Sequence, residues 1–263
     1  MDFILVVIGV FFALYMFGYV IYITLGVVTS IWGLRKSRLK ERMESELDHD
    51  FYFPISILLP AYNEEKTILT TVNYLIEMNY KLFEIVVIDD GSSDNTAHFI
   101  IDNYNLKQDH KPIRLQVNSK EILEVYSGEY NNIPIVLVRK KNGGNKADAV
   151  NAGINVSRYP YFVSMDADEI LQGNALKYAA RLFLEDDKVI AVGGQIRIAN
   201  GQKFEKAMPV NMRMNKHFLV SMQTLEYIRS FIASRMFHDI FNSNLNISGG
   251  FGLFKKDSVI AIG

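Results

Sequence analysis

Two aspartates, Asp166 and Asp168, directly follow the apolar segment Tyr161-Phe162-Val163-Ser164-Met165. In an extended segment, residues two apart point to the same face, so we expect both carboxylates to project together from the end of a strand. Two such groups repel each other by up to about 4 kcal/mol at about 4 Å in a partly shielded site, unless a cation lies between them. Oxygen ligands favour a hard ion, so the pair predicts a site for Mg²⁺ or Mn²⁺. The alternative is an acidic turn that caps a following helix.

Three further polar clusters have side chains that suit a nucleotide. The segment Pro60-Ala61-Tyr62-Asn63-Glu64 offers an aromatic ring and a carboxylate on a fixed turn, which suits a flat base with donor groups. Asp90 follows a buried strand and can accept hydrogen bonds from an imide or from ribose hydroxyls. In Asn142-Gly143-Gly144-Asn145-Lys146 the glycines allow close approach to phosphate, while a helix start and the lysine add positive charge. Each cluster alone could be an ordinary turn or helix cap; together they provide for base, ribose, phosphates and metal.

The elements that must position these clusters are read from the hydrophobic pattern. Short apolar runs alternate with helical patterns, which predicts a mainly parallel sheet covered on both faces. Strands are predicted at 55–59, 84–88, 113–117, 135–138, 161–165, 189–198 and 248–254, and helices at 63–78, 96–104, 146–154, 175–184 and 216–241. A polar insertion is expected around 119–132. The helix at 216–241 is expected to pack against the sheet; the alternative is that its aromatic residues lie at the membrane surface. Ligands of such sheets bind at the carboxyl ends of the strands, where all four polar clusters fall.

Composition excludes several classes of function. The 263 residues contain no cysteine, so a disulfide framework, a thiol nucleophile and a Cys-based zinc site are excluded. The five histidines are scattered without metal-ligand spacing, and the formal net charge of −1 gives no indication of nucleic-acid binding. The loop at Gly143-Gly144 is not a Walker A sequence, and no Gly-x-Gly-x-x-Gly follows the first strand. A P-loop NTPase and a dinucleotide-dependent dehydrogenase are therefore disfavoured.

The N-terminal segment predicts a membrane span. Phe3 to Trp32 comprises thirty residues without a formal charge. As a helix it would extend about 45 Å, against a hydrocarbon core of about 30 Å. Several Lys and Arg residues follow at once, beginning at Arg35, so the positive-inside rule predicts an external N-terminus and a cytoplasmic C-terminal side. We therefore expect a single-pass anchor at residues 1–34, a charged juxtamembrane spacer at 35–52 and a cytoplasmic domain at 53–263.

Together the motifs resemble those of the family 2 glycosyltransferases with a GT-A fold. The resemblance covers about residues 53–263 and is to the membrane-bound processive branch that includes poly-N-acetylglucosamine, hyaluronan and cellulose synthases. It rests on Leu59-Pro60-Ala61-Tyr62-Asn63-Glu64-Glu65, Val87-Ile88-Asp89-Asp90-Gly91-Ser92-Ser93-Asp94, Asn142-Gly143-Gly144-Asn145-Lys146-Ala147-Asp148-Ala149-Val150-Asn151, Met165-Asp166-Ala167-Asp168 and Ser248-Gly249-Gly250-Phe251-Gly252. The family implies an inverting transfer of a sugar, usually from a UDP-linked donor, to a saccharide or lipid-linked acceptor.

The resemblance also implies roles for single residues. The implied donor-binding residues are Pro60, Ala61, Tyr62, Glu64, Asp90, Lys146 and Asp166, the implied metal ligands are Asp166 and Asp168, and the implied acceptor-side residues are Ser248, Gly249 and Gly250. Within the Asp-x-Asp pair, Asp168 is expected to be the more direct ligand of Mg²⁺ or Mn²⁺.

The family's general base and its Gln-x-x-Arg-Trp acceptor motif are not found in this sequence, whose single tryptophan is Trp32. Asp257 and Glu226 lack the expected context, so no catalytic base is assigned and the base is expected beyond Gly263. Residues 1–263 alone are therefore expected to bind donor without forming polymer. Two alternatives stay open: a single-transfer enzyme acting on a lipid-phosphate acceptor, and a truncated, inactive membrane protein that binds a UDP-sugar.

Overall fold

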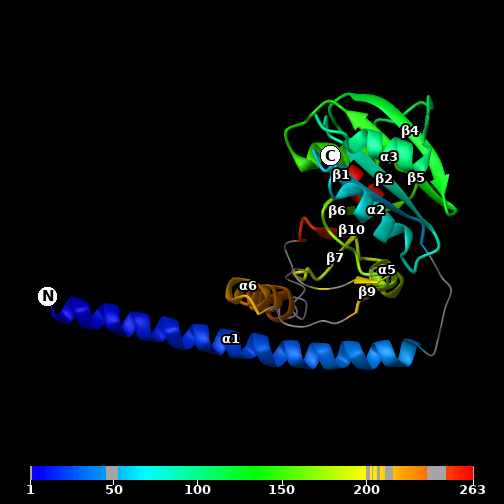
Figure 1. The fold of residues 1–263 in the computed structure, drawn as a ribbon. Helices are drawn as coiled ribbons and strands as arrows, with labels where there is room; N and C mark the ends of the chain where they lie inside the picture. Colours follow the sequence, from blue (N-terminus) through cyan, green and yellow to red (C-terminus); the bar gives the residue numbers. More distant parts are fainter. Residues whose placement is uncertain are drawn as a thin grey trace. The chain divides into compact units, whose positions relative to one another are not determined.

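The computed structural model describes residues 2–45, 53–199, 202, 204–205, 208–210, 216–235 and 247–262 of the chain. The chain divides into two compact units, which are described separately. One unit contains the N-terminal helix and the helical segment at 216–235, and the other contains the β-sheet and the helices that cover it (Figure 1).

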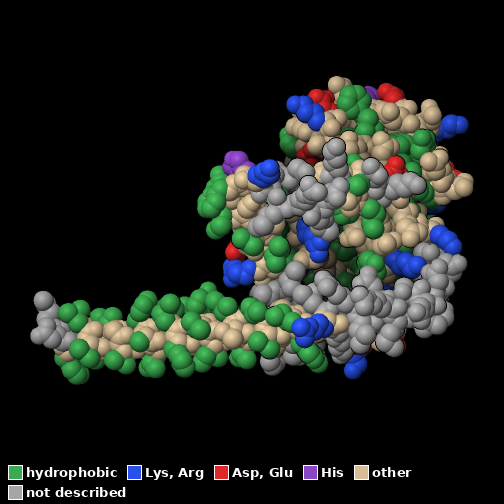
Figure 2. All heavy atoms as spheres, turned by 60° about the horizontal axis from the view of Figure 1, so that its bottom comes forward, with side chains coloured by type: hydrophobic (Ala, Val, Ile, Leu, Met, Phe, Trp, Pro, Cys, Tyr) green, Lys and Arg blue, Asp and Glu red, His purple; other side chains and the backbone are tan. Residues whose placement is uncertain are grey.

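Helix α1 (Asp2–Ser45) runs without interruption for 44 residues. At 1.5 Å per residue it is about 66 Å long. Its segment Phe3–Gly33 has a mean hydropathy of 2.6 and is long and apolar enough to cross a membrane. Figure 2 shows hydrophobic side chains along the visible face of this segment. The predicted anchor and the first part of the predicted spacer therefore form one continuous helix.

The helix predicted at 216–241 differs from the expectation in two ways. Helix α6 (Phe218–Ile228) is followed directly by a π-helical turn, η1 (Arg229–Ser234), and residues 236–241 lie outside the described part of the chain. The turn η1 contacts α1, and the whole segment belongs to the unit of α1 rather than to the unit of the sheet. The contact found for this segment is thus with α1, and its expected packing against the sheet stays a prediction.

In the second unit the described residues form an eight-stranded sheet with the strand order β3-β4-β5-β2-β1-β6-β10-β7. Its strands are β1 (Ile55–Ala61), β2 (Phe83–Asp89), β3 (Lys107–Gln108), β4 (Ile122–Tyr130), β5 (Ile133–Lys140), β6 (Tyr161–Met165), β7 (Ala191–Gly193) and β10 (Phe251–Lys255). The central strands β5, β2, β1 and β6 are parallel, and the outer pairs are antiparallel. The sheet is thus mixed, with the expected parallel core. Strands β8 (Phe204–Glu205) and β9 (Met208–Pro209) form a separate small hairpin.

Helices cover both faces of the sheet because its central strands are apolar on both sides (Figure 1). In β1, Ile57 and Leu59 point to one face and Leu58 to the other, and all three are fully buried. The first face packs against α2 (Ile68–Ile76), α3 (Thr96–Tyr104) and α5 (Ala175–Glu185). The second face packs against α4 (Lys146–Val156) and α8 (Lys256–Ile260). The alternation of side chains along each strand thus builds two hydrophobic cores.

Several predicted elements need correction. Residues 113–117 form no strand, and the predicted polar insertion at 119–132 contains β4, which pairs antiparallel with β5. Most side chains of β4 are only partly buried, so its hydrophobic pattern is weak. Asn131 and Asn132 join β4 to β5 with φ angles of 52° and 63°, as required by the tight hairpin turn with two left-handed residues. In the segment 189–198 only β7 is a strand, and the helix predicted at 63–78 is confined to α2.

Candidate active site

The candidate site lies at one edge of the sheet, where the parallel strands end. The pairing of Ala61 with Asp89 and of Asp89 with Arg139 aligns the ends of β1, β2 and β5. Strand β10 is antiparallel to β6, and Phe251 at its start pairs with Met165 at the end of β6. The turn before β10 therefore reaches the same edge as the loops that follow β1, β2, β5 and β6. This arrangement brings together the four polar clusters predicted from the sequence and the segment 248–250.

The loops after β1 and β2, which carry the predicted nucleoside-binding residues, are bonded to each other. Asn63, whose φ angle is 57°, donates its backbone N–H to Ser92 Oγ at 3.0 Å and accepts a hydrogen bond from the backbone N–H of Ser93 at 2.9 Å. The N–H of Asp90 donates to the carbonyl of Ala61 at 2.9 Å. Tyr62 remains 53% exposed beside these bonds. The two loops therefore form one rigid platform that leaves an aromatic ring available to a ligand.

The loop before α4 requires glycine at two positions and ends in a helix cap. Gly144 has a φ angle of +74°, which favours glycine, and a Cβ on Gly143 would lie 2.1 Å from Asp148 Oδ2. Asn145 caps α4, because its side-chain oxygen accepts a hydrogen bond from the N–H of Asp148 at 2.9 Å. The capped helix directs the positive end of its dipole toward the sheet edge. The φ angle of Gly144, the lack of room for a Cβ at Gly143 and the cap by Asn145 thus explain why these residue types occur in the loop.

Lys146, the first residue of α4, connects three segments of the site. Its Nζ pairs with Asp166 after β6 and donates to the carbonyl oxygen of Gly249 before β10 at 2.6 Å. The side chains of Lys146 and Asp166 are 35% and 43% exposed, so a ligand can reach both. The sequence predicted Lys146 and Asp166 as parts of one site, and the structure brings them into contact. The link to Gly249 also brings one of the predicted acceptor-side residues to the site.

The two aspartates of the predicted metal site lie in the turn after β6, which ends at Met165. The alternation of a strand therefore does not set their directions, contrary to the prediction from residue spacing. Asp168 is exposed, and the backbone of the turn is fixed by a hydrogen bond from Thr71 Oγ1 to the Ala167 carbonyl at 2.6 Å. Burial of its carboxyl group is the largest cause that raises the pKa of Glu169, and the negative charge of Asp166 is the second.

These residues fit a hard divalent cation. Carboxylate oxygens are the ligands that Mg²⁺ and Mn²⁺ prefer, and the turn places Asp166, Asp168 and Glu169 close together in the chain. Asp166 already contacts a cation, the ammonium of Lys146. Among the described residues, no group of three or more His, Asp or Glu side chains could hold a metal ion. A metal at this turn would therefore draw its remaining ligands from water and from a bound diphosphate.

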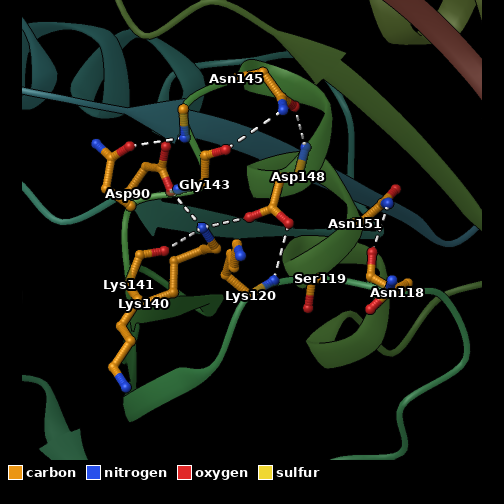
Figure 3. A network of polar contacts seen from close by, with 12 residues as sticks. Asp90, Asn118, Ser119, Lys120, Lys140, Lys141, Gly143, Asn145, Asp148 and Asn151 are labelled. Atoms are coloured by element: carbon orange, nitrogen blue, oxygen red, sulfur yellow. Dashed lines mark hydrogen bonds and ion pairs between the residues drawn. The ribbon is translucent and has the colours of Figure 1, made fainter.

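Sequence reasoning did not identify Lys140, the last residue of β5, which is 1% exposed (Figure 3). Its ammonium pairs with Asp90 and lies 2.6 Å from both Asp148 Oδ2 and the Lys141 carbonyl oxygen. Burial acts to raise the pKa of Asp148, but the Lys140 ammonium and the Lys120 backbone N–H outweigh it, so that the pKa is lowered. The run Arg139-Lys140-Lys141 was the available signal, but the sequence does not show which of the three is buried.

The structure gives neither Asp257 nor Glu226 a place in the site. Asp257 lies in α8, after the carboxyl end of β10, and β10 is antiparallel to β6. Asp257 therefore lies at the edge of the sheet opposite to the site. Glu226 belongs to the other unit, where its carboxylate pairs with Arg229 at 2.6 Å. The general base stays unassigned.

Comparison with known proteins identifies a family and several relatives. A family model described as glycosyl transferase family 2 matches residues 56–120 and 116–263. The poly-beta-1,6-N-acetyl-D-glucosamine synthase of Staphylococcus aureus (strain COL) is 31% identical over 229 residues, which are 87% of this chain and 46% of the relative. The synthase of the same name from Staphylococcus epidermidis is 30% identical over 216 residues, 82% of this chain and 43% of the relative. The chain thus spans about half the length of these curated relatives.

Among solved structures, the mannosyltransferase PcManGT from Pyrobaculum calidifontis in complex with GDP-Man and Mn²⁺ matches with a TM-score of 0.52. The match covers 92% of this chain and 58% of that one at 15% sequence identity, a level at which it shows a shared fold only. It confirms the expected GT-A type of α/β fold. Because the family model matches most of the sheet unit, and the synthases are similar over the same region, this chain belongs to glycosyl transferase family 2.

Proposed function

We propose that this chain is the membrane-anchored, donor-binding part of an inverting glycosyltransferase that uses a UDP-sugar and Mg²⁺ or Mn²⁺ and transfers a hexosyl or N-acetylhexosaminyl unit to a saccharide acceptor. One observation carries the proposal: the Lys146 ammonium contacts both Asp166 and the Gly249 carbonyl at the edge where the parallel strands end. A single cation is thereby held between the predicted metal turn and the predicted acceptor-side segment. This is the position in which a diphosphate leaving group needs positive charge.

On this proposal the uridine binds at the platform after β1 and β2. The exposed ring of Tyr62 stacks against the base, and Pro60 and Ala61 fix the turn that presents it. Asp90 accepts hydrogen bonds from the imide or the ribose, and Glu64 provides a second carboxylate. The rigid hydrogen bonding between the two loops supports this assignment, because a preorganised surface loses little freedom when a ligand binds.

The diphosphate then lies at the start of α4. As the bond between the anomeric carbon and the diphosphate oxygen breaks, negative charge develops on that oxygen, and Lys146 donates a hydrogen bond to it. The N-terminal end of α4 adds partial positive charge. Asp166 and Asp168 would hold the divalent cation, which when bound neutralises further charge on the leaving group. Ser248, Gly249 and Gly250 border the side from which an acceptor hydroxyl approaches.

The substrate and the location rest on the relatives and on α1. The similar synthases are named for a polymer of N-acetylglucosamine, which favours UDP-N-acetylglucosamine as donor. The apolar segment Phe3–Gly33 is proposed to anchor the domain, with the N-terminus outside and the sheet unit in the cytoplasm. The proposed domain division remains anchor 1–34, spacer 35–52 and catalytic domain 53–263.

Titration of the detergent-solubilised chain with UDP, with and without Mn²⁺, tests the proposal. We expect Mn²⁺ to increase the affinity for UDP, and the variant Asp168→Ala to abolish this increase. Asp187→Ala is the matched control, because Asp187 is an exposed aspartate in the turn between α5 and β7, away from the strand ends that form the site. Equal affinity with and without metal, or an unchanged metal effect in Asp168→Ala, would refute the proposed role of the aspartate pair.

A further inference from the structure

The buried ammonium of Lys140 joins two parts of the site that are distant in the sequence. It pairs with Asp90 in the loop after β2 and with Asp148 in the first turn of α4, and it donates to its neighbour's carbonyl (Figure 3). The Lys140 side chain is 0% exposed, whereas those of Asp90 and Asp148 are 10% and 17% exposed. The three charges therefore form one cluster behind the surface that a ligand would contact.

The two carboxylate oxygens of Asp90 have different contacts. Oδ1 accepts the hydrogen bond from Lys140 Nζ and another, at 3.0 Å, from the backbone N–H of Gly143. Both donors belong to the protein and lie on the α4 side, so Oδ1 is occupied by hydrogen bonds within the protein. Oδ2 is then the oxygen that can accept a hydrogen bond from a nucleoside. A carboxylate fixed at one oxygen by an ammonium and an N–H can present the other oxygen in one direction only.

The same cluster ties the nucleoside platform to the phosphate-binding loop. Asp148 Oδ1 accepts a hydrogen bond from the backbone N–H of Lys120 at 2.9 Å, and its own N–H is the one that Asn145 caps. Gly143, which donates to Asp90, lies in the loop that precedes α4. Without the Lys140 ammonium, the start of α4 would keep the Asn145 cap and the hydrogen bond from Lys120, whereas Asp90 Oδ1 would keep the N–H of Gly143 but lose its charged partner.

We propose, on the basis of the proposed function, that Lys140 is a positioning residue which aims Asp90 at the nucleoside of the donor. Lys140 itself touches no substrate. Its contribution is selective for the uridine part of the ligand, because the phosphate-binding groups Lys146 and the N-terminus of α4 do not depend on the orientation of Asp90.

The test compares UDP with inorganic pyrophosphate, which retains the phosphate contacts and lacks the nucleoside. For Lys140→Met, with folding monitored by thermal melting, we expect UDP to bind at least about tenfold more weakly and pyrophosphate to stay within about threefold of wild type. In an Asp90→Ala background the same substitution should cause no further loss of UDP affinity, because its effect acts through Asp90. Lys141→Met is the matched control, since that side chain is 62% exposed and its ammonium pairs with Glu121 at 2.5 Å.

A second variant allows the same test if Lys140→Met does not fold. The double variant Lys140→Met/Asp148→Asn keeps the formal charge of the cluster at −1, as in the wild type with one lysine and two aspartates. It should show the same selective loss of UDP affinity.

Wild-type affinity for UDP in either folded variant, or an equal loss for UDP and pyrophosphate, would overturn the proposal. So would a failure of both variants to fold, since Lys140 would then be a purely structural residue. If the wild-type chain itself binds no UDP, the proposed function fails instead, and the two failures are distinguishable.

Discussion

Replacement of Lys146 by methionine is the sharpest test of the proposed diphosphate site. Methionine preserves the length and much of the apolar stem of the side chain while removing its charge. The lost contacts in the free protein are those of the ammonium with Asp166 and with the Gly249 carbonyl. Both partners are accessible to water, since the side chain of Asp166 is 43% exposed, so the fold should tolerate the change.

The expected loss of affinity follows from the type of bond that Lys146 makes to a phosphate. A hydrogen bond to a charged group contributes about 1.5–3 kcal/mol, and each 1.4 kcal/mol changes a dissociation constant tenfold. Lys146→Met should therefore weaken UDP binding by about 10- to 150-fold. Uridine, which has no phosphate, should lose less than about twofold, because its contacts with the platform after β1 and β2 do not involve the ammonium.

Isothermal titration of the detergent-solubilised chain with UDP and with uridine, both in Mn²⁺, measures these changes. Lys111→Met is the charge-matched control, because the side chain of Lys111 is 83% exposed and its ammonium pairs with Asp109 at 3.2 Å. Its UDP affinity should stay within about twofold of wild type if long-range charge has a small effect in salt. The proposed contact of Lys146 with the diphosphate is contradicted if Lys146→Met binds UDP with wild-type affinity, or if both variants lose UDP affinity equally.

Three further predictions concern topology and stability. Because the chain has no cysteine, single cysteines introduced at positions 2 and 37 can be labelled selectively. We expect a membrane-impermeant reagent to label position 2 from outside and not to label position 37. External labelling at position 37 would contradict the proposed topology. The raised pKa of Glu169 means that its protonated form is favoured in the folded state, so this contribution to stability is present below the unfolded pKa of about 4.3 and is lost as the pH rises through the folded value. Glu169→Gln should therefore melt at a higher temperature than wild type at pH 7 in the absence of divalent metal, with a smaller difference near pH 4; parallel melting profiles across this range would rule the effect out. Glu84 is fully buried near the start of β2 and accepts hydrogen bonds from Ser56 Oγ at 2.6 Å and from the Arg158 N–H and Nε at 2.7 and 2.9 Å. Glu84→Ala should cost about 1–3 kcal/mol of unfolding free energy in thermal or denaturant melts, because the buried Ser56 hydroxyl loses its acceptor while the Arg158 side chain is 57% exposed. UDP affinity should stay unchanged, because Glu84 lies at the edge opposite to the site; a loss of UDP affinity in the folded variant would contradict that separation.

The sequence alone determined the central part of the fold. Strands β1, β2, β5 and β6 read as near-continuous apolar runs because both of their faces are buried, and each run is followed at once by polar residues. That pattern is local, so it can be recognised in the sequence without knowledge of tertiary contacts. It placed Asp90, Lys146 and Asp166 at strand ends or at the start of a helix, and parallel strands bring such positions to one edge. The apolar length of α1 is equally local.

Elements whose pattern depends on their neighbours were not predictable in the same way. Strand β4 was missed because it lies near the edge of the sheet, where partial exposure allows Glu124 and Glu129 within the strand. The segment at 216–235 carries apolar residues that either a sheet or another helix could bury, and only the tertiary structure assigned it to the unit of α1.

The buried lysine is the clearest case of information that only the tertiary structure supplies. Arg139, Lys140 and Lys141 are adjacent and basic, yet Lys140 is buried between two aspartates while the side chain of Lys141 is 62% exposed. The difference arises because β5 ends at Lys140 and pairs in a fixed register with β2, so that one ammonium faces Asp90 across the strand ends. The sequence predicts which residues bind a nucleotide; the register of the sheet decides which of the three basic side chains is buried beside Asp90.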